Sequence, residues 1–188
     1  MHSTRMGTRI RSKAGVLLAG GVVLLAAVGC HSKTAATPAN FVVALNAYFM
    51  EHPECLFPQA PRFPYEATDP AEMKPMDALV KEQMLTTEVE PSIHVSRYTP
   101  TDAGARAAPR FCYGHRMIAS IDSFTPPAQA DGFMETQVTY RYTMDEVPVW
   151  AESDGMRAAF PAMAVATSGA GMGKVTLASS MAGWTVPD

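Results

Sequence analysis

Residues 137–144 read QVTYRYTM, a stretch that sets the fold class because hydrophobic and polar side chains alternate in it without a break. A period of two is typical of a β-strand with one buried face. That face would carry Val138, Tyr140, Tyr142 and Met144. The segment 111–124, FCYGHRMIASIDSF, is also rich in aromatic and β-branched residues. A proline-containing loop over 126–132 separates the two segments, so we expect them to pair as antiparallel strands.

Further along the chain, residues 174–181 alternate in the same way and predict a last strand. After it, Trp184 and Val186 could pack against the sheet as part of a short tail. Between the strands, residues 147–166 predict a short helix interrupted at Pro161. The C-terminal half is therefore expected to form an antiparallel sheet.

The N-terminal half has the spacing of helices. Hydrophobic residues recur every three or four positions after Asn40, a plausible N-cap, and this pattern stops near His52 and Pro53. The proline-rich run 53–75 predicts neither a regular helix nor a central strand. It should nevertheless pack on the core as an ordered loop, because it contains Leu56, Phe57, Phe63 and Tyr65. From Met76 the spacing is helical again, and 93–98 predicts a strand. The fold class is α+β.

Part of this half resembles a known family. The segments MDALVKEQMLTTE (76–88) and RYTPTDAG (97–104) resemble the recognition helix and the wing of winged-helix domains. The resemblance covers Met76 to Ala107 and implies a helix followed by a wing hairpin. Gln83 stands where the family has Gly, and Pro100 stands where it has Leu. DNA binding does not follow from this likeness of fold.

The N-terminus resembles a lipoprotein signal. Four basic residues precede an apolar run over 15–28, which is shorter than a membrane-spanning helix needs. The run ends in LAAVGC (25–30), which resembles a bacterial lipobox, although Ala27 stands where Leu is usual. The resemblance implies that Cys30 is acylated and becomes the first mature residue. An ordinary secretory signal and a short membrane anchor are the alternatives.

These patterns predict three parts of the chain. Residues 1–29 would be the signal peptide, 30–39 the lipidated cysteine with a flexible tether, and 40–188 one globular α+β domain. A tether of this length reaches about 15 to 20 Å, so the domain would sit close to the membrane. His31 follows Cys30 where retained lipoproteins have Asp, and the resemblance then implies the outer membrane, with the domain facing the periplasm.

The charge of the mature chain limits its partners. Without the four basic residues of the signal, 11 Lys and Arg face 18 Asp and Glu, a formal charge of −7. An acidic chain without a basic run lacks the surface that binds phosphate backbones. We therefore expect no nucleic-acid partner. The expected partners are the membrane, through the lipid, and an envelope protein or a cell-wall component.

The cysteines support export. Acylation would consume Cys30 and leave Cys55 and Cys112 as a pair, which in an oxidising periplasm most simply forms a disulfide. The chain-entropy model assigns such a long loop about 4 kcal/mol of stabilisation. The alternative is a zinc site, because His52-x2-Cys55 and Cys112-x2-His115 have ligand spacing. A second alternative makes one of these cysteines a nucleophile and a neighbouring histidine its base.

Other patterns are weaker candidates for chemistry. His115 and Asp122 with Ser120 or Ser123 could form a catalytic triad on paper, but no G-x-S-x-G motif is present. The glycine-rich run 168–176 departs from both phosphate-loop patterns and predicts a flexible turn. Met73-x-x-Met76 has copper-ligand spacing, although core filling is the ordinary role of methionine.

The sequence therefore predicts an envelope lipoprotein with a non-catalytic binding or scaffolding role and no cofactor. Trp150, between acidic neighbours, is expected to anchor the core. The alternative function is a periplasmic hydrolase or a metal-dependent enzyme centred on one set of four residues. These are His52, Cys55, Cys112 and His115.

Overall fold

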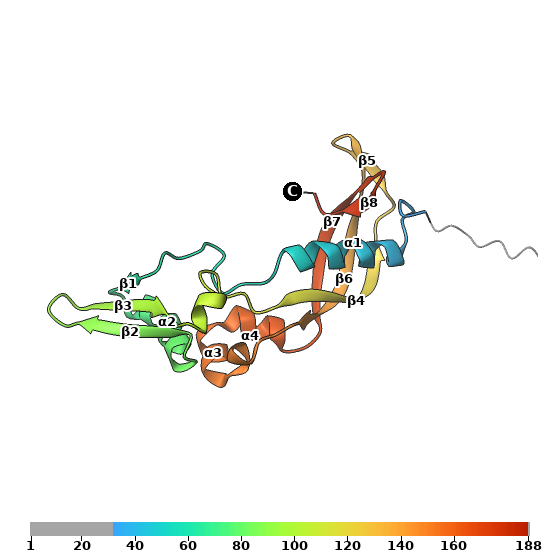
Figure 1. Ribbon diagram of the computed structural model, residues 1–188. Helices are drawn as coiled ribbons and strands as arrows, with labels where there is room; N and C mark the ends of the chain where they lie inside the picture. Colours follow the sequence, from blue (N-terminus) through green and yellow to red (C-terminus); the bar gives the residue numbers. More distant parts are fainter. Residues whose placement is uncertain (1–31, 188) are drawn as a thin grey trace, which may run out of the picture. The chain divides into compact units, whose positions relative to one another are not determined.

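The computed structural model describes residues 32–187, which form a mixed α+β fold with two antiparallel sheets (Figure 1). The predicted α+β class is confirmed, and one sheet lies in the C-terminal half as expected. The helices are α1 (Pro38–Glu51), α2 (Pro70–Lys81), α3 (Asp154–Ala159) and α4 (Pro161–Thr167). The strands are β1 (Tyr65–Ala67), β2 (Leu85–Glu90), β3 (Val95–Pro100), β4 (His115–Phe124), β5 (Ala128–Ala130), β6 (Phe133–Asp145), β7 (Gly171–Ser180) and β8 (Gly183–Thr185).

The larger sheet has the order β4-β6-β7-β8, and the short β5 pairs with β6. The predicted antiparallel pairing of β4 and β6 is confirmed, with Ile118 opposite Tyr142. β4 begins at His115 rather than at Phe111, because Phe111 and Gly114 have positive φ and turn the chain before the strand. β6 begins earlier than predicted, at Phe133. Asp131 (φ 48°) and Gly132 (φ 85°) form the tight turn from β5, a turn that favours this pair of residues.

Helix α1 packs across one face of this sheet (Figure 1). It begins before Asn40, because the Thr37 side chain accepts a hydrogen bond from the Asn40 amide and Pro38 occupies the first turn. It ends at Glu51, as predicted. Its hydrophobic side packs on the inner face of the sheet to form what we call the α1 core. Its buried members are Phe41, Ala44, Leu45, Phe49, Ile118, Val138, Tyr140, Tyr142, Leu177 and Trp184.

The chain ahead of α1 is hydrogen-bonded to α1 and to β8 from Ser32 onward. The Asn40 side-chain amide donates to the carbonyl oxygens of Ser32 (2.9 Å) and Ala35 (2.8 Å). The Trp184 indole donates to the carbonyl oxygens of Thr34 (3.2 Å) and Ala35 (3.1 Å). Folded structure therefore begins before Asn40 and includes most of the segment predicted as a tether. Cys30 and the signal lie outside the described residues.

The smaller sheet has the order β1-β3-β2 and packs with α2 around a second centre, the α2 core. Its buried members are Ala67, Met76, Ala78, Leu79, Met84, Leu85, Tyr98, Phe111, Tyr113, Ala151, Met156 and Met163. As predicted, the hydrophobic residues of the proline-rich run pack against it, namely Leu56, Phe57, Phe63 and Tyr65. Trp150 also packs there, 6.3 Å from Phe111 between ring centroids.

The prediction that the proline-rich run contains no regular helix was wrong. Helix α2 begins at Pro70 and contains Pro75, because Asp69 caps it by accepting a hydrogen bond from the Ala71 amide (2.7 Å). A proline at the first helical position loses no hydrogen bond, and Pro75 removes a single one. The same run also contains β1, which lies at the edge of its sheet and so does not contradict the exclusion of a central strand. A strand of three residues at the edge of a sheet tolerates neighbouring prolines.

The strand β2 was missed, because the helical spacing from Met76 continues as far as Leu85. The helix instead ends at Lys81, and Gln83 adopts the left-handed conformation (φ 59°). The Gln83 amide donates to Val80 and the Met84 amide to Leu79, both at 2.9 Å, which is the Schellman pattern of a helix end. β2 then pairs with β3 as a hairpin.

The rest of the C-terminal half follows the prediction closely. The helix predicted over 147–166 is a 3-10 turn (Val149–Glu152) followed by α3 and α4, which are separated at Phe160 and Pro161. β7 begins at Gly171, earlier than predicted. Trp184 is buried against the sheet as expected, but it lies within the strand β8 and not in a tail as predicted.

Candidate functional site

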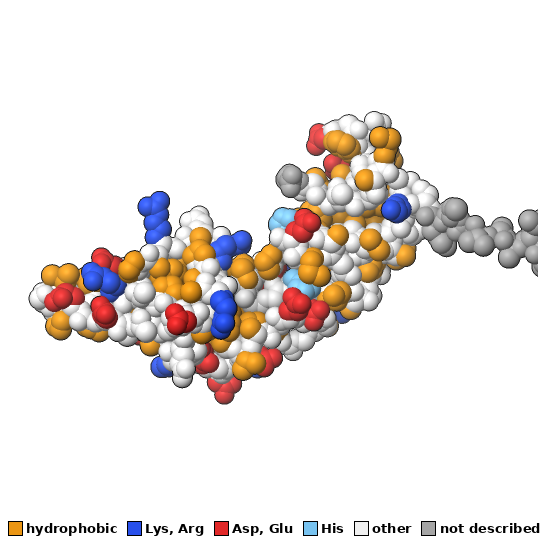
Figure 2. Space-filling model, in the orientation of Figure 1, with side chains coloured by type: hydrophobic (Ala, Val, Ile, Leu, Met, Phe, Trp, Pro, Cys, Tyr) orange, Lys and Arg blue, Asp and Glu red, His pale blue; other side chains and the backbone are white. Residues whose placement is uncertain are grey.

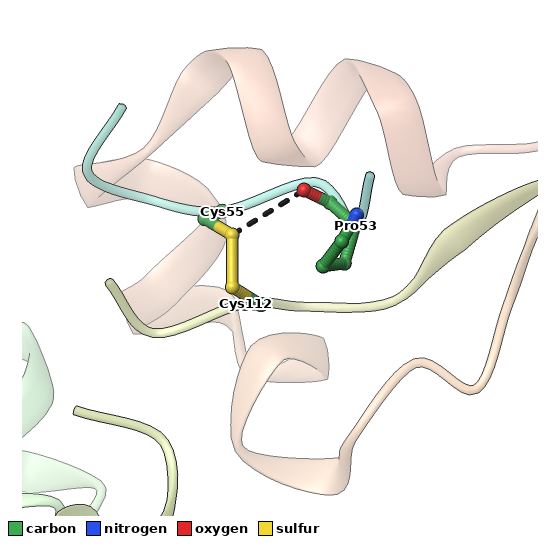
Figure 3. Close-up of a disulfide and its surroundings, with 3 residues drawn as sticks. All are labelled: Pro53, Cys55 and Cys112. Carbon is green, nitrogen blue, oxygen red and sulfur yellow. Dashed lines mark hydrogen bonds between the residues drawn. A yellow bond between two sulfur atoms is a disulfide. The ribbon is translucent and has the colours of Figure 1, made fainter. Parts of the chain in front are cut away.

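Cys55 and Cys112 form the predicted disulfide, with an S–S distance of 2.03 Å (Figure 3). Backbone hydrogen bonds bring the two segments together: the Leu56 amide donates to Phe111, and the Tyr113 amide donates to Glu54. The Cys55 sulfur also lies 3.3 Å from the Pro53 carbonyl oxygen. A disulfide sulfur has no proton to donate, so this is a close contact and not a hydrogen bond. Both sulfurs are thus occupied by each other.

The two histidines of the predicted four-residue site have separate surroundings. His52 is exposed, stacks on Tyr48 with 4.0 Å between ring centroids, and has its Nδ1 2.8 Å from the Tyr48 carbonyl oxygen. His115 is buried at the start of β4. Its Nδ1 lies 3.6 Å from a carboxylate oxygen of the exposed Glu146, and its Nε2 has no hydrogen-bond partner in the described part of the chain.

This geometry does not assemble a metal or nucleophile site from these residues. The sulfurs are bonded to each other, so neither is a free thiolate for a metal or a substrate. Within residues 32–187, no group of three or more His, Cys, Asp or Glu side chains could hold a metal ion.

The structure shows a polar cluster beside the disulfide that sequence analysis missed. The Arg116 Nε lies 2.7 Å from a carboxylate oxygen of Glu54, and its Nη1 donates to the Tyr140 hydroxyl at 3.2 Å. Its guanidinium lies over the rings of Phe49 (5.2 Å) and Tyr142 (4.6 Å). The Nε contact lacks hydrogen-bond geometry, so it is an ion pair. In the sequence, Glu54 precedes Cys55 and Arg116 follows Cys112 by four positions. This nearness to the paired cysteines is the one sequence signal that points to the cluster.

The contacts of this cluster stabilise the charged guanidinium of Arg116 and do not produce a reactive acid, base or nucleophile. Burial opposes the charged guanidinium, but the Tyr140 hydrogen bond and the Glu54 carboxylate outweigh it, so the pKa of Arg116 is raised. Burial raises the pKa of Tyr140, and the hydrogen bond and charge of Arg116 offset only part of this rise. Both groups are therefore held in their usual protonation states. The cluster ties the segment around Glu54 to the α1 core.

The weaker candidates are also accounted for. Asp122 is paired with Arg141 (3.0 Å) and accepts a long hydrogen bond from Ser120 (3.4 Å), whereas His115 is buried at the other end of β4. Met76 is buried in the α2 core, and Met73 packs against that core.

The glycine-rich run serves packing. A Cβ at Gly173 would lie 2.4 Å from the Tyr140 ring, and one at Gly171 would lie 2.4 Å from the Tyr142 ring. These glycines let the two tyrosine rings lie over β7. The sequence alone does not show this role, because it depends on the pairing of β6 with β7.

The face of the larger sheet that α1 leaves uncovered is mainly polar, although the exposed Met172 lies on it opposite Arg141. Antiparallel sheets commonly keep one face in water, and β6 alternates accordingly between buried and more exposed residues. Its cross-strand pairs include Thr139 with Lys174 and Gln137 with Thr176. The ion pair of Asp122 and Arg141 lies on the same face. The face therefore offers neutral, positively charged and negatively charged hydrogen-bonding groups. It is a candidate binding surface rather than a reaction site.

Comparison with protein-family models, characterised proteins and solved structures found no match to this chain. Within residues 32–187, no helix is both long enough and apolar enough to cross a membrane. The functional argument therefore rests on the residues of the chain itself.

Proposed function

We propose that this protein is an envelope lipoprotein, anchored through Cys30 to the outer membrane and facing the periplasm, with a non-catalytic binding or scaffolding role. The observation that carries the proposal is the disulfide between Cys55 and Cys112. Disulfides persist in oxidising compartments, which supports export. The pairing also leaves Cys30, the last residue of the lipobox, as the cysteine free for acylation.

The start of the folded unit supports a membrane-proximal position. The first described residue, Ser32, is bonded to Asn40 of α1, and it follows Cys30 by two positions. A lipid on Cys30 would hold the domain against the bilayer with little free chain between them. Such an arrangement suits a protein that positions other components at the membrane.

The likeness to winged-helix domains is a finer proposal about the fold. It is supported by α2, by the β2–β3 hairpin that follows it, and by the left-handed Gln83 where the family has Gly. Gly is the residue that adopts this conformation most easily, so a left-handed residue at this position supports the proposed likeness. The negative charge of the chain favours a protein or cell-wall partner over DNA.

Anchoring is tested by expressing the full chain in a Gram-negative bacterium and measuring the mass and location of the mature protein. We expect an acylated Cys30, recovery in the outer-membrane fraction, and an oxidised Cys55–Cys112 pair. The matched variant Cys30→Ser should lose the acyl mass and the membrane association while keeping the disulfide. Recovery of an unacylated wild-type protein in the soluble periplasm would overturn the proposal.

The binding role is tested by photo-crosslinking in intact cells. A photoreactive residue at Thr139, on the uncovered sheet face, should give a discrete crosslinked product with an envelope protein or the cell wall. The same residue at the exposed Val165 of α4 is the control. Equal or absent crosslinking at both positions contradicts a binding role for this face. A purified protein with bound zinc and two reduced thiols would instead favour the hydrolase or metal-enzyme alternative.

A further inference from the structure

Three large apolar side chains are exposed at one end of the five-stranded sheet. Met181 is fully exposed, Phe133 is 55 % exposed and Met134 is 44 % exposed. Strand pairing brings them to the same end, because Met134 lies opposite Ser179 and the chain turns at Met181 between β7 and β8. Hydrophobic side chains are visible at the surface near β5, at this end of the sheet (Figure 2). We call Phe133, Met134 and Met181 the apolar tip.

The apolar tip surrounds the end of the sheet instead of covering one face. Successive residues of a strand point to opposite faces, so Phe133 and Met134 expose apolar surface on both sides of β6. A flat protein partner would cover one side and leave the other in water. A membrane interface would surround both at once.

The described chain begins at this same end (Figure 1). A Cβ added at Gly183, two residues after Met181, would lie 3.5 Å from the Lys33 carbonyl oxygen. The indole of Trp184 holds the carbonyl oxygens of Thr34 and Ala35. Lys33 follows Cys30 by three positions, a span of at most about 11 Å. The site of the proposed lipid is therefore tied to the end of the domain that carries the apolar tip.

We propose that the apolar tip docks on the surface of the membrane in which Cys30 is anchored, so that the domain has a fixed orientation. The proposal rests on the acylation of Cys30 and adds a second, non-covalent contact. Lys33, Asp131 and Glu135 lie near the tip and give it no net positive charge, so the contact does not depend on anionic lipid. The opposite end of β7, which carries the exposed Met172, would point away from the bilayer.

The test places a fluorophore at either end of β7 in the full-length acylated protein. Met181→Cys reports on the apolar tip, and Met172→Cys is the matched control, since both are exposed methionines about 30 Å apart along the strand. The proteins are reconstituted into phosphatidylcholine vesicles, with and without phosphatidylglycerol, that contain a lipid-attached quencher. We expect several-fold stronger quenching at position 181 than at 172, with little effect of phosphatidylglycerol.

A second set of variants tests the apolar contact itself. In the Met181→Cys background, Phe133→Ser with Met134→Ser should lower the quenching several-fold. Val165→Ser, which removes an exposed apolar side chain from α4, should leave it unchanged. Equal quenching at 181 and 172 would overturn the proposal. So would fluorophore self-quenching at 181 without lipid quenching, because it indicates a second copy of the chain on the tip.

Acylation of Cys30 and docking of the apolar tip can be tested independently. Mass spectrometry of the same sample shows whether Cys30 is acylated. If it is not, labelled Met181→Cys and Met172→Cys proteins are mixed with the same vesicles in the Cys30→Ala background. A blue shift of the label at 181, without one at 172, supports docking by the apolar tip. The absence of a blue shift at 181 overturns it.

Discussion

The two cores of this protein are built in different ways. The α1 core consists of one long amphipathic helix on a sheet whose central strands are regular and paired over nine residues. The α2 core consists of a short strand, a capped helix that contains proline, a hairpin and two short helices from a distant part of the chain. In the first, side-chain periodicity determines the structure. In the second, capping, turns and distant contacts do.

This difference explains what the sequence could reveal. Alternation in β6 and β7 and helical spacing in α1 are local patterns, so the larger sheet and its helix were predicted. β1, β2 and the start of α2 depend on an N-cap, a left-handed residue and pairing with β3, and these do not show in hydrophobic periodicity. The following experiments test whether the two cores also differ in what stabilises them.

The largest effect is expected from removal of the disulfide. Cys55→Ser with Cys112→Ser should lower the free energy of unfolding by about 4 kcal/mol, because 57 residues separate the two cysteines. The segment after Cys55 contributes Leu56 and Phe57 to the α2 core without regular secondary structure. We therefore expect hydrogen exchange to accelerate more in the α2 core than in β6. Urea unfolding and amide exchange measure the two effects.

Reduction of the wild-type protein is the control, and it should reproduce the loss without any substitution. A loss below about 1 kcal/mol would mean that the backbone bonds around Cys55 already hold the segments together in the denatured state. Equal acceleration of exchange in both cores would remove the distinction between them.

A smaller effect is expected at the glycines of β7, where the α1 core is tightly packed. Gly173→Ala should destabilise the protein by about 2 kcal/mol, because the new Cβ would lie 2.4 Å from the Tyr140 ring. Gly155→Ala in α3, beside the α2 core, is the matched control. Its nearest neighbour would be 3.9 Å away, so it should stabilise α3 by about 0.5 kcal/mol. Thermal unfolding of both variants gives the comparison, and a destabilising Gly155→Ala would contradict it.

The candidate site was predicted less well than the fold. The pairing of Cys55 with Cys112 followed from parity and compartment, and the structure has it. The cluster of Arg116, Glu54 and Tyr140 was not predicted, because its members come from three segments that only the folded chain brings together. The sequence hints at it only through the nearness of Glu54 and Arg116 to the paired cysteines. The spacing of each cysteine from a histidine suggested a zinc site as an alternative. The disulfide instead uses both sulfurs, so neither can bind a metal.

The next effect in size is expected in the α2 core, where Tyr98 is buried and donates to Asp77 at 2.7 Å. Burial, together with the hydrogen bond to Asp77 and its charge, raises the pKa of Tyr98 to about 12. Tyr98→Phe should lower the free energy of unfolding by about 1.5 kcal/mol at neutral pH, since a hydrogen bond to a charged group is lost.

The pH dependence of this contribution has a definite sign. The folded protein retains the phenolic proton to a higher pH than the unfolded chain, whose tyrosine pKa is about 10. The contribution is therefore complete below pH 10 and is lost as the pH rises toward 12. The difference in stability between wild type and Tyr98→Phe should shrink over that interval. A constant difference would show that Tyr98 titrates normally in the folded protein.

The smallest effect is expected when glutamine is replaced by glycine, once at the end of α2 and once in β6. Gln83→Gly should raise the free energy of unfolding by about 0.5 kcal/mol, because Gln83 is exposed and holds a left-handed conformation (φ 59°) that glycine adopts without strain. Gln137→Gly, at an exposed position in the extended strand β6, should lower it by about 0.5 to 1 kcal/mol. Urea unfolding measures both.

Opposite signs for the same change of side chain would show that backbone conformation decides the effect at each position. They would also support the proposed likeness to winged-helix domains, which rests in part on Gly at the position of Gln83. The same sign at both positions would mean that glycine acts mainly through the entropy of the unfolded chain. In that case the left-handed turn after α2 would be held by the Schellman hydrogen bonds of Gln83 and Met84 at no measurable cost.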